Sequence, residues 1–182
     1  MDTDLVIRAQ GGDEEAFASL AVAIGGRLNA VAHRILREVD LAEDATQQAL
    51  LSIWRDLPRL RDPARFEAWS YRVLVNACTT QARTQRRTAS NLRLLPSDET
   101  ASSDGLRSVV DRDQLDRGFR RLSVDHRAVV VLHHYLDLSL EDVAETLGVP
   151  IGTVRSRLHY AMRGLRAALE ADARPITREA LP

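Results

Sequence analysis

Residues 139–166 read SLEDVAETLGVPIGTVRSRLHYAMRGLR, and this stretch predicts two helices joined by a tight turn. Ser139 is a favourable N-cap, because its hydroxyl can accept a hydrogen bond from a free amide in the first helical turn. Gly148 suits the end of that helix, since glycine readily adopts the left-handed conformation, and Pro150 cannot continue a helix. Thr153 is the expected cap of the second helix. The order of these signals is typical of a helix-turn-helix unit.

The second of these two helices is amphipathic and rich in arginine. Apolar residues recur along it at three- and four-residue intervals and predict a buried stripe, formed by Val154, Leu158, Ala161, Leu165 and Leu169. The outer faces are left to Arg155, Ser156, Arg157, His159, Tyr160 and Arg163. A helix of this kind fits the major groove of DNA, where arginine binds guanine or phosphate. An ordinary solvated helix would not explain why a cap, a glycine turn and a basic helix follow in this order.

The net charge of −1 arises from 26 acidic and 25 basic residues, and every basic residue is arginine. These charges are unevenly distributed along the chain. Residues 1–60 hold ten acids and six arginines, whereas residues 61–90 hold six arginines and two acids. Residues 152–167 hold four arginines and no acid. Because local patches rather than the overall charge attract phosphate, the nearly neutral total is compatible with nucleic-acid binding.

Composition and motifs exclude several classes of protein. The chain has 182 residues, of which 45% are hydrophobic and 4% aromatic, so a packed helical core is expected. No apolar run approaches the length of a membrane span, and the N-terminus lacks the apolar core of a signal peptide. Cys78 is the single cysteine, so no internal disulfide can form. These features favour a soluble cytoplasmic protein. No enzyme motif is present, so no catalytic residue and no cofactor are expected.

The sequence also argues against a metal site and a redox role. His133 and His134 are adjacent, and adjacent residues of a helix point about 100° apart, which makes them a poor pair of metal ligands. No cysteine lies near them, so no metal is expected. Cys78 falls within a predicted helix and is interpreted as a packed residue rather than a redox sensor.

The hydrophobic periodicity predicts an all-α protein with two small helical domains joined by a flexible linker, the C-terminal one a helix-turn-helix. The predicted segments are residues 1–90 for the first domain, 91–112 for the linker, 113–170 for the second domain and 171–182 for a tail. The linker is inferred because Ser, Thr, Asp and Gly are frequent there and the periodicity fades. Helices of the first domain are expected at 4–10, 14–37, 40–57 and 66–87.

Three stretches of the chain resemble bacterial RNA polymerase sigma factors of the extracytoplasmic-function (ECF) type. Residues 42–57 (AEDATQQALLSIWRDL) resemble the family's segment that binds core polymerase. Residues 66–87 (FEAWSYRVLVNACTTQARTQRR) resemble the helix that melts and reads the −10 element, and residues 122–166 resemble the domain that reads the −35 element. Three matches in the right order and at the right separations are specific. The resemblance implies a transcription initiation factor that binds core RNA polymerase and directs it to promoters.

The resemblance also implies roles for three sets of residues. Core RNA polymerase, through its β′ and β subunits, is the implied partner, and contact with a coiled coil of β′ is implied for Asp44, Gln47, Gln48, Leu51 and Trp54. Contact with the −10 element is implied for Arg61, Asp62, Arg65, Phe66, Trp69, Arg72, Asn76, Arg83, Arg86 and Arg87. Contact with the −35 element is implied for Thr153, Arg155, Ser156, Arg157, His159 and Arg163. For Trp69 and Phe66, a place in the core is an equally good interpretation, and Trp54 also falls among the predicted core positions.

One departure from the family pattern lies in the second helix. The family often carries Arg-Ala-Arg after the histidine, where this chain has Tyr160-Ala161-Met162 and then Arg163, so an altered promoter preference is expected. ECF relatives are commonly held inactive by an anti-sigma factor, often membrane-anchored. The resemblance implies such a partner, with no direct membrane insertion of this chain. The linker should let the two domains close on each other and hide both DNA surfaces.

Two other classes of function remain open at this point. A helix-turn-helix repressor or activator would act on duplex operators without polymerase. A pure interaction protein would sequester another regulator through its acidic helix. A stable complex with core polymerase and promoter-dependent initiation would separate a sigma factor from both.

Overall fold

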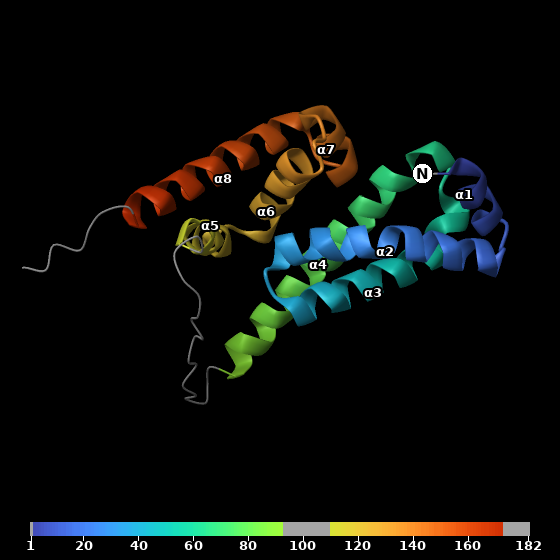
Figure 1. Cartoon of the computed structure of the whole chain (residues 1–182), viewed down its shortest axis with the longest axis horizontal. Helices are drawn as coiled ribbons and strands as arrows, with labels where there is room; N and C mark the ends of the chain where they lie inside the picture. Colours follow the sequence, from blue (N-terminus) through green and yellow to red (C-terminus); the bar gives the residue numbers. More distant parts are fainter. Residues whose placement is uncertain (1, 93–109, 173–182) are drawn as a thin grey trace, which may run out of the picture.

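The computed structural model describes residues 2–92 and 110–172, and within these ranges the chain is all-helical (Figure 1). The first half contains α1 Thr3–Gln10, α2 Glu14–Leu36, α3 Val39–Asp56 and α4 Phe66–Leu92, with short 3-10 turns at Leu57–Arg59 and Pro63–Arg65. The second half contains α5 Val110–Arg121, α6 Val124–Val130, a π-helical turn at Val131–Tyr135, α7 Leu140–Leu147 and α8 Ile151–Asp172. The predicted fold class is confirmed. Most of the predicted linker and tail, at 93–109 and 173–182, lies outside the described residues.

Local capping explains where the helices of the first half begin. The Asp13 carboxylate accepts a hydrogen bond from the Ala16 amide at 2.9 Å, which confirms Asp13 as the cap of α2. The helix α2 continues through Gly25-Gly26 without a break. The helix α4 runs beyond its predicted end at residue 87, to Leu92.

Small residues let the helices of the first half approach closely. The buried face of α3 carries Ala42, Ala45 and Ala49, which lie against the larger buried side chains of α2. In α2 these side chains recur at helical spacing, from Leu20 to Leu36. The most extensive packing in the protein joins α3 to α4 and α2 to α3. The helices α2, α3 and α4 therefore pack around a shared hydrophobic core.

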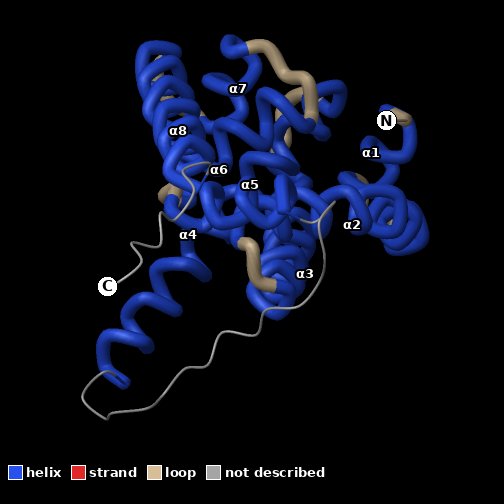
Figure 2. Tube along the Cα trace, turned by 60° about the vertical axis from the view of Figure 1, so that its left-hand side comes forward, coloured by secondary structure: helices blue, strands red, loops and turns tan. Residues whose placement is uncertain are grey.

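The second half packs directly against the first, so that segments far apart in sequence lie side by side (Figures 1 and 2). The helix α7 contacts α4, and α6 contacts both α2 and α4. Leu74 of α4 belongs to the same buried cluster as Leu132 and Val143 of the second half. Polar contacts add to this interface, because the Arg34 guanidinium lies 3.7 Å from the centre of the Tyr135 ring. The expectation that the two domains close on each other is confirmed.

The helix-turn-helix forms largely as its sequence predicts. The Ser139 hydroxyl accepts from the Asp142 amide at 3.0 Å and caps α7. Gly148 ends that helix in the left-handed conformation, at φ 64°. The expected cap at Thr153 is wrong, because α8 begins earlier, at Ile151. The carbonyl of Pro150 accepts from the Thr153 amide at 2.8 Å, so Pro150 occupies the position that precedes the helix.

Replacement of Gly148 by alanine should weaken the fold. A side chain at a left-handed φ is strained, and the added Cβ would lie 2.6 Å from Nη2 of Arg72. We expect Gly148→Ala to lower the free energy of unfolding by about 1–2 kcal/mol, most of it from the backbone, since the end of Arg72 can move. Urea denaturation followed by circular dichroism measures this change.

The matched control is Gly26→Ala in α2. No atom lies within 4 Å of a Cβ added there, and its φ is not positive. Alanine is the better helix former by about 1 kcal/mol, so this control should stabilise the protein. Equal effects of the two substitutions would contradict the role assigned to Gly148.

Candidate nucleic-acid interface

The helix α8 presents most of the predicted −35 residues on one exposed face. Arg155, Ser156, His159 and Arg163 are all exposed and recur at helical spacing. The helix packs through its other faces on α5, α6 and α7, and it lies at the edge of the molecule opposite α3 (Figure 1). Arg155 makes a long ion pair with Glu141, at 3.8 Å, so its guanidinium is nearly free. This face is open to a DNA groove even while the two halves are packed together.

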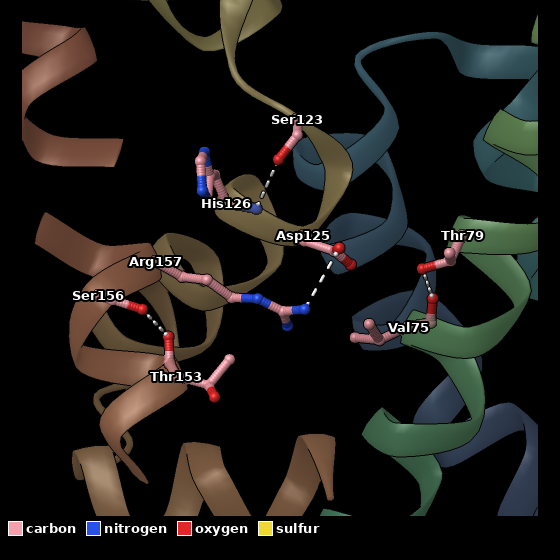
Figure 3. A network of polar contacts seen from close by, with 8 residues as sticks. All are labelled: Val75, Thr79, Ser123, Asp125, His126, Thr153, Ser156 and Arg157. Atoms are coloured by element: carbon pink, nitrogen blue, oxygen red, sulfur yellow. Dashed lines mark hydrogen bonds and ion pairs between the residues drawn. The ribbon is translucent and has the colours of Figure 1, made fainter. Parts of the chain in front are cut away.

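Two of the predicted −35 side chains, those of Arg157 and Ser156, make hydrogen bonds within the protein (Figure 3). The Arg157 guanidinium donates to the Asp125 carboxylate of α6 at 3.3 Å, and its side chain is only a quarter exposed. The backbone carbonyl of Thr153 accepts from the Ser156 hydroxyl at 3.0 Å. Arg157 therefore links α8 to α6. The partner Asp125 was not anticipated from the sequence.

The Tyr160-Ala161-Met162 departure falls partly on the exposed face. Tyr160 and Met162 are exposed, whereas Ala161 is fully buried. The Arg163 guanidinium lies 6.0 Å from the centre of the Tyr160 ring, and the His159 ring meets the same ring edge-on at 5.6 Å. The surface beside the recognition residues is thus aromatic and apolar, where the family pattern would place arginine.

The predicted −10 residues begin in the turns before α4. Asp62 caps the Pro63–Arg65 turn by accepting from the Ala64 amide at 3.0 Å. The Gln10 side chain of α1 holds the preceding segment by donating to the carbonyls of Leu57, at 3.1 Å, and Leu60, at 2.7 Å. Arg61 and Asp62 are exposed as a result.

Most of the remaining −10 residues follow one stripe along α4. The spacing of three or four residues, or multiples of it, places one group on a common side of the helix: Trp69, Arg72, Asn76, Arg83 and Arg87. All but the half-buried Trp69 are exposed, as is the neighbouring Arg86. The C-terminal turns of α4 project away from the other helices (Figure 2). The stripe is therefore a continuous polar and basic track.

Phe66 does not belong to this stripe. Its side chain is only 1% exposed and is the largest among the fully buried residues. The ring packs 6.1 Å from that of Trp69, which is half-buried. The prediction that Phe66 contacts the −10 element is contradicted by this burial, and Phe66 is a core residue. Trp69 keeps one side available to a base.

The helix α7 lies over the beginning of this track. Glu145 forms an ion pair with Arg65, and the Arg72 guanidinium lies against the turn at Gly148. A cavity of about 790 Å³ remains between α4 and the second half, lined by Trp69 and Thr146 among others. Arg65 and Arg72 nevertheless stay exposed, as does the outer face of α8, so the expectation that closure hides both DNA surfaces is wrong for these residues.

The predicted polymerase-binding residues form a third surface, on α3. Asp44, Gln47, Gln48, Leu51 and Trp54 are all exposed. Leu51 is 64% and Trp54 40% exposed, which is unusual for such large apolar side chains and shows that Trp54 is not a core position.

A shallow groove of about 550 Å³ runs between α3 and α2 beside these residues. Gln47, Leu50, Leu51 and Trp54 line one wall, and Phe17 of α2 lies 4.5 Å from the Trp54 ring, measured between ring centres. Sequence analysis did not identify Phe17 as part of this groove. Its position in the apolar stripe of α2 gave no signal of this.

Cys78 and the histidine pair show no sign of a chemical role. Cys78 is fully buried, and this burial raises the pKa of its thiol to about 12, so the thiolate is not available. The Nδ1 atom of His133 lies 2.7 Å from the carbonyl oxygen of Leu138, within hydrogen-bond distance. Among residues 2–92 and 110–172, no three His, Cys, Asp or Glu side chains gather as metal ligands would. No helix in those ranges has both the length and the apolar character to cross a membrane.

A helix-turn-helix with an exposed basic helix, a second basic track and an apolar groove on a separate helix define a multi-surface DNA-binding protein. The chain matches the family model of Sigma-70 region 2 over residues 20–88 and that of Sigma-70, region 4 over residues 118–167. It is 32% identical to the ECF RNA polymerase sigma factor SigL of Mycobacterium tuberculosis over 140 residues, covering 75% of this chain and 79% of SigL. The chain belongs to the ECF family of RNA polymerase sigma factors, and it directs RNA polymerase to promoters.

Further relatives cover nearly the whole chain. It is 28% identical to the ECF RNA polymerase sigma-E factor of Escherichia coli K12, over 97% of this chain and 96% of the relative. The sigma factor RpoE from Bartonella quintana, solved with the anti-sigma factor NepR, is 25% identical with a TM-score of 0.67, over 86% of this chain and 98% of RpoE. CnrH, solved with the cytosolic domain of CnrY, has the same identity and TM-score, over 94% of this chain and 99% of CnrH. A regulator that acts on duplex operators alone is not favoured.

Proposed function

We propose that the exposed face of α8 reads the −35 element while the track along α4 binds and holds open the −10 element. The observation that carries this division is the placement of two basic surfaces on separate helices, one in each half of the chain. Arginine and serine on α8 have the chemistry for base edges and phosphate in a major groove. Trp69 and the arginines of α4 have the chemistry for stacking on unpaired bases and following a backbone. Phe66 is left out of this set because it is buried.

The groove between α2 and α3 is the surface that we assign to core polymerase. Exposed Leu51 and Trp54 give it an apolar centre, and Asp44, Gln47 and Gln48 give it a polar rim. This arrangement suits a pair of partner helices of the kind that the family's β′ contact implies. Phe17 supports the Trp54 ring from α2 and belongs to the proposed surface.

Reconstituted transcription tests the proposal. The full chain is mixed with core RNA polymerase, and the 5′ ends of transcripts from a genomic template library are sequenced. We expect a stable complex and start sites that share two upstream elements. Binding to duplex DNA without a complex with core, or transcripts that start independently of any shared element, would contradict it.

A specific prediction concerns Arg155. We expect Arg155→Ala to reduce transcription from promoters with an intact −35 element about tenfold or more, because a bidentate contact to a base contributes about 1–3 kcal/mol. Promoters already impaired at the contacted base pair should lose little further activity. The measurement is initiation in vitro on a set of −35 substitutions. Arg166→Ala, an exposed arginine on the same helix outside the proposed set, is the control and should behave like the unmodified chain.

An anti-sigma factor is the regulatory partner that we propose for this chain. Both structural relatives with a TM-score of 0.67 were solved with another protein, NepR in one case and the cytosolic domain of CnrY in the other, and NepR is described as an anti-sigma factor. We further propose that the chain acts in the cytoplasm, where core polymerase is found, and has no enzymatic activity of its own. Co-purification of the tagged chain from its native cells tests whether such a partner exists.

A further inference from the structure

A small polar cavity of about 160 Å³ lies where the two halves of the protein meet, beside the basic track of α4, with which it shares Arg86. Its walls come from the junction of α2 and α3, from α4, and from α5 and α6 of the second half. Four arginines contribute to these walls: Arg37, Arg86, Arg120 and Arg127. Like charges repel one another at close range, so their convergence in one cavity calls for a physical reason.

The acidic groups around the cavity do not balance these arginines. Asp116 pairs with Arg37 and also accepts from Arg120, at 3.0 Å. Glu38 lines the cavity and accepts from the Gln85 amide at 2.7 Å, so it is already hydrogen-bonded. Among the residues whose side chains the structure describes, four guanidinium groups thus meet two carboxylates.

Arg127 is the most buried of the four arginines. The residue as a whole is only 8% exposed. Its Nη1 atom donates a long hydrogen bond, 3.4 Å, to the carbonyl of Leu36. Its Nε atom has no partner among the described residues, and the same holds for Nε of Arg37. Burial lowers the pKa of Arg127, and the nearby charges of Arg37 and Arg86 lower it further. A buried cation with open hydrogen-bonding capacity is costly unless an anion neutralises it.

The backbone beside the cavity also favours an anion. The 18-residue helix α3 begins at Val39, directly after Glu38, whose side chain makes no capping hydrogen bond. Glu38 and Leu41 both line the cavity, so the start of α3 borders it. The N-terminus of a helix attracts anions through its free amides and its dipole. Arg37 reaches this position through a left-handed backbone conformation, at φ 66°, which is uncommon for arginine.

We propose that this cavity is a binding site for a phosphate-type oxyanion, held by the guanidinium groups of Arg37 and Arg127 and by the first amides of α3. The volume of about 160 Å³ corresponds to about five water molecules, which is enough for a phosphate group. Arginine binds phosphate oxygens through paired, charge-assisted hydrogen bonds. Because the walls come from both halves, a bound oxyanion holds the two halves together.

The test is a titration of the full-length, 15N-labelled chain with inorganic phosphate, with chloride used to keep the ionic strength constant. We expect saturable shifts of the backbone amides in residues 37–42 and 120–127, together with a higher midpoint of thermal unfolding. Shifts that do not saturate, or that fall on the exposed arginines of α8 instead, would overturn the proposal. A parallel titration with a short non-promoter duplex separates a free oxyanion from the DNA backbone. Shifts at the cavity with the duplex but not with phosphate would also overturn it.

Two arginine variants make the test specific. Arg37→Gln should weaken phosphate binding at least tenfold, whereas Arg59→Gln, an exposed arginine outside the cavity, should leave it unchanged. Equal phosphate affinity in the Arg37 variant and the unmodified chain would refute the assignment. Arg127→Gln is the stronger change, but it alters a buried side chain. The partly exposed Arg37 and the titration of the unmodified chain therefore decide the outcome even if the Arg127 variant does not fold.

Discussion

Leu51→Asp should strongly reduce promoter-dependent transcription by weakening the complex with core polymerase. Leu51 is 64% exposed at the edge of the groove between α2 and α3, so an aspartate there is solvated in the free protein and the fold is retained. In the complex the same carboxylate would be buried against an apolar partner without a counter-charge. We expect the affinity for core polymerase to fall about thirtyfold or more, equivalent to about 2 kcal/mol, as for a central interface residue.

The affinity is measured by fluorescence anisotropy of the labelled chain with core polymerase, and the stability by urea denaturation. Val22→Asp is the matched control, because Val22 is 83% exposed on α2 and does not line the groove. It should leave both quantities unchanged. If the two variants bind core polymerase equally well, the groove is not the polymerase surface.

Phe66→Ala should produce the largest loss of stability among the substitutions considered. The Phe66 ring is only 1% exposed at the start of α4, so its removal leaves a cavity in a close-packed core. We expect the free energy of unfolding to fall by about 3–5 kcal/mol. Urea denaturation at low temperature measures this loss, and any loss of transcription should follow the fraction of unfolded protein.

Trp69→Ala separates packing from contact with DNA. Trp69 is half-buried on the same helix, so its removal should cost less stability than that of Phe66. If Trp69 stacks on an unpaired base, binding to a premelted −10 fragment should weaken by about 1–3 kcal/mol. Unchanged binding to that fragment by a folded Trp69→Ala variant would contradict the stacking role.

Local signals made much of the architecture predictable from the sequence. Ser139 and Gly148 act within a single turn of α7, so a few neighbouring residues suffice to predict where that helix begins and ends. The apolar spacing of α2 and α8 likewise follows from the geometry of one helix. The family resemblance depended on the order of such segments, which is a property of the chain itself. The fold class and the promoter-directing function were accessible for this reason.

The burial of individual side chains and the identity of the residues they contact could not be predicted, because both depend on residues far apart in the chain. Phe66 and Trp69 look alike in sequence, yet the tertiary packing buries the first and leaves the second half-buried beside a cavity. Phe17 reaches the groove because α2 lies next to α3. The ion pairs of Arg157 with α6 and of Arg65 with α7 are contacts between elements that no local pattern encodes. Sequence spacing fixes the face of a helix on which a residue lies, whereas only the tertiary packing decides what that face meets.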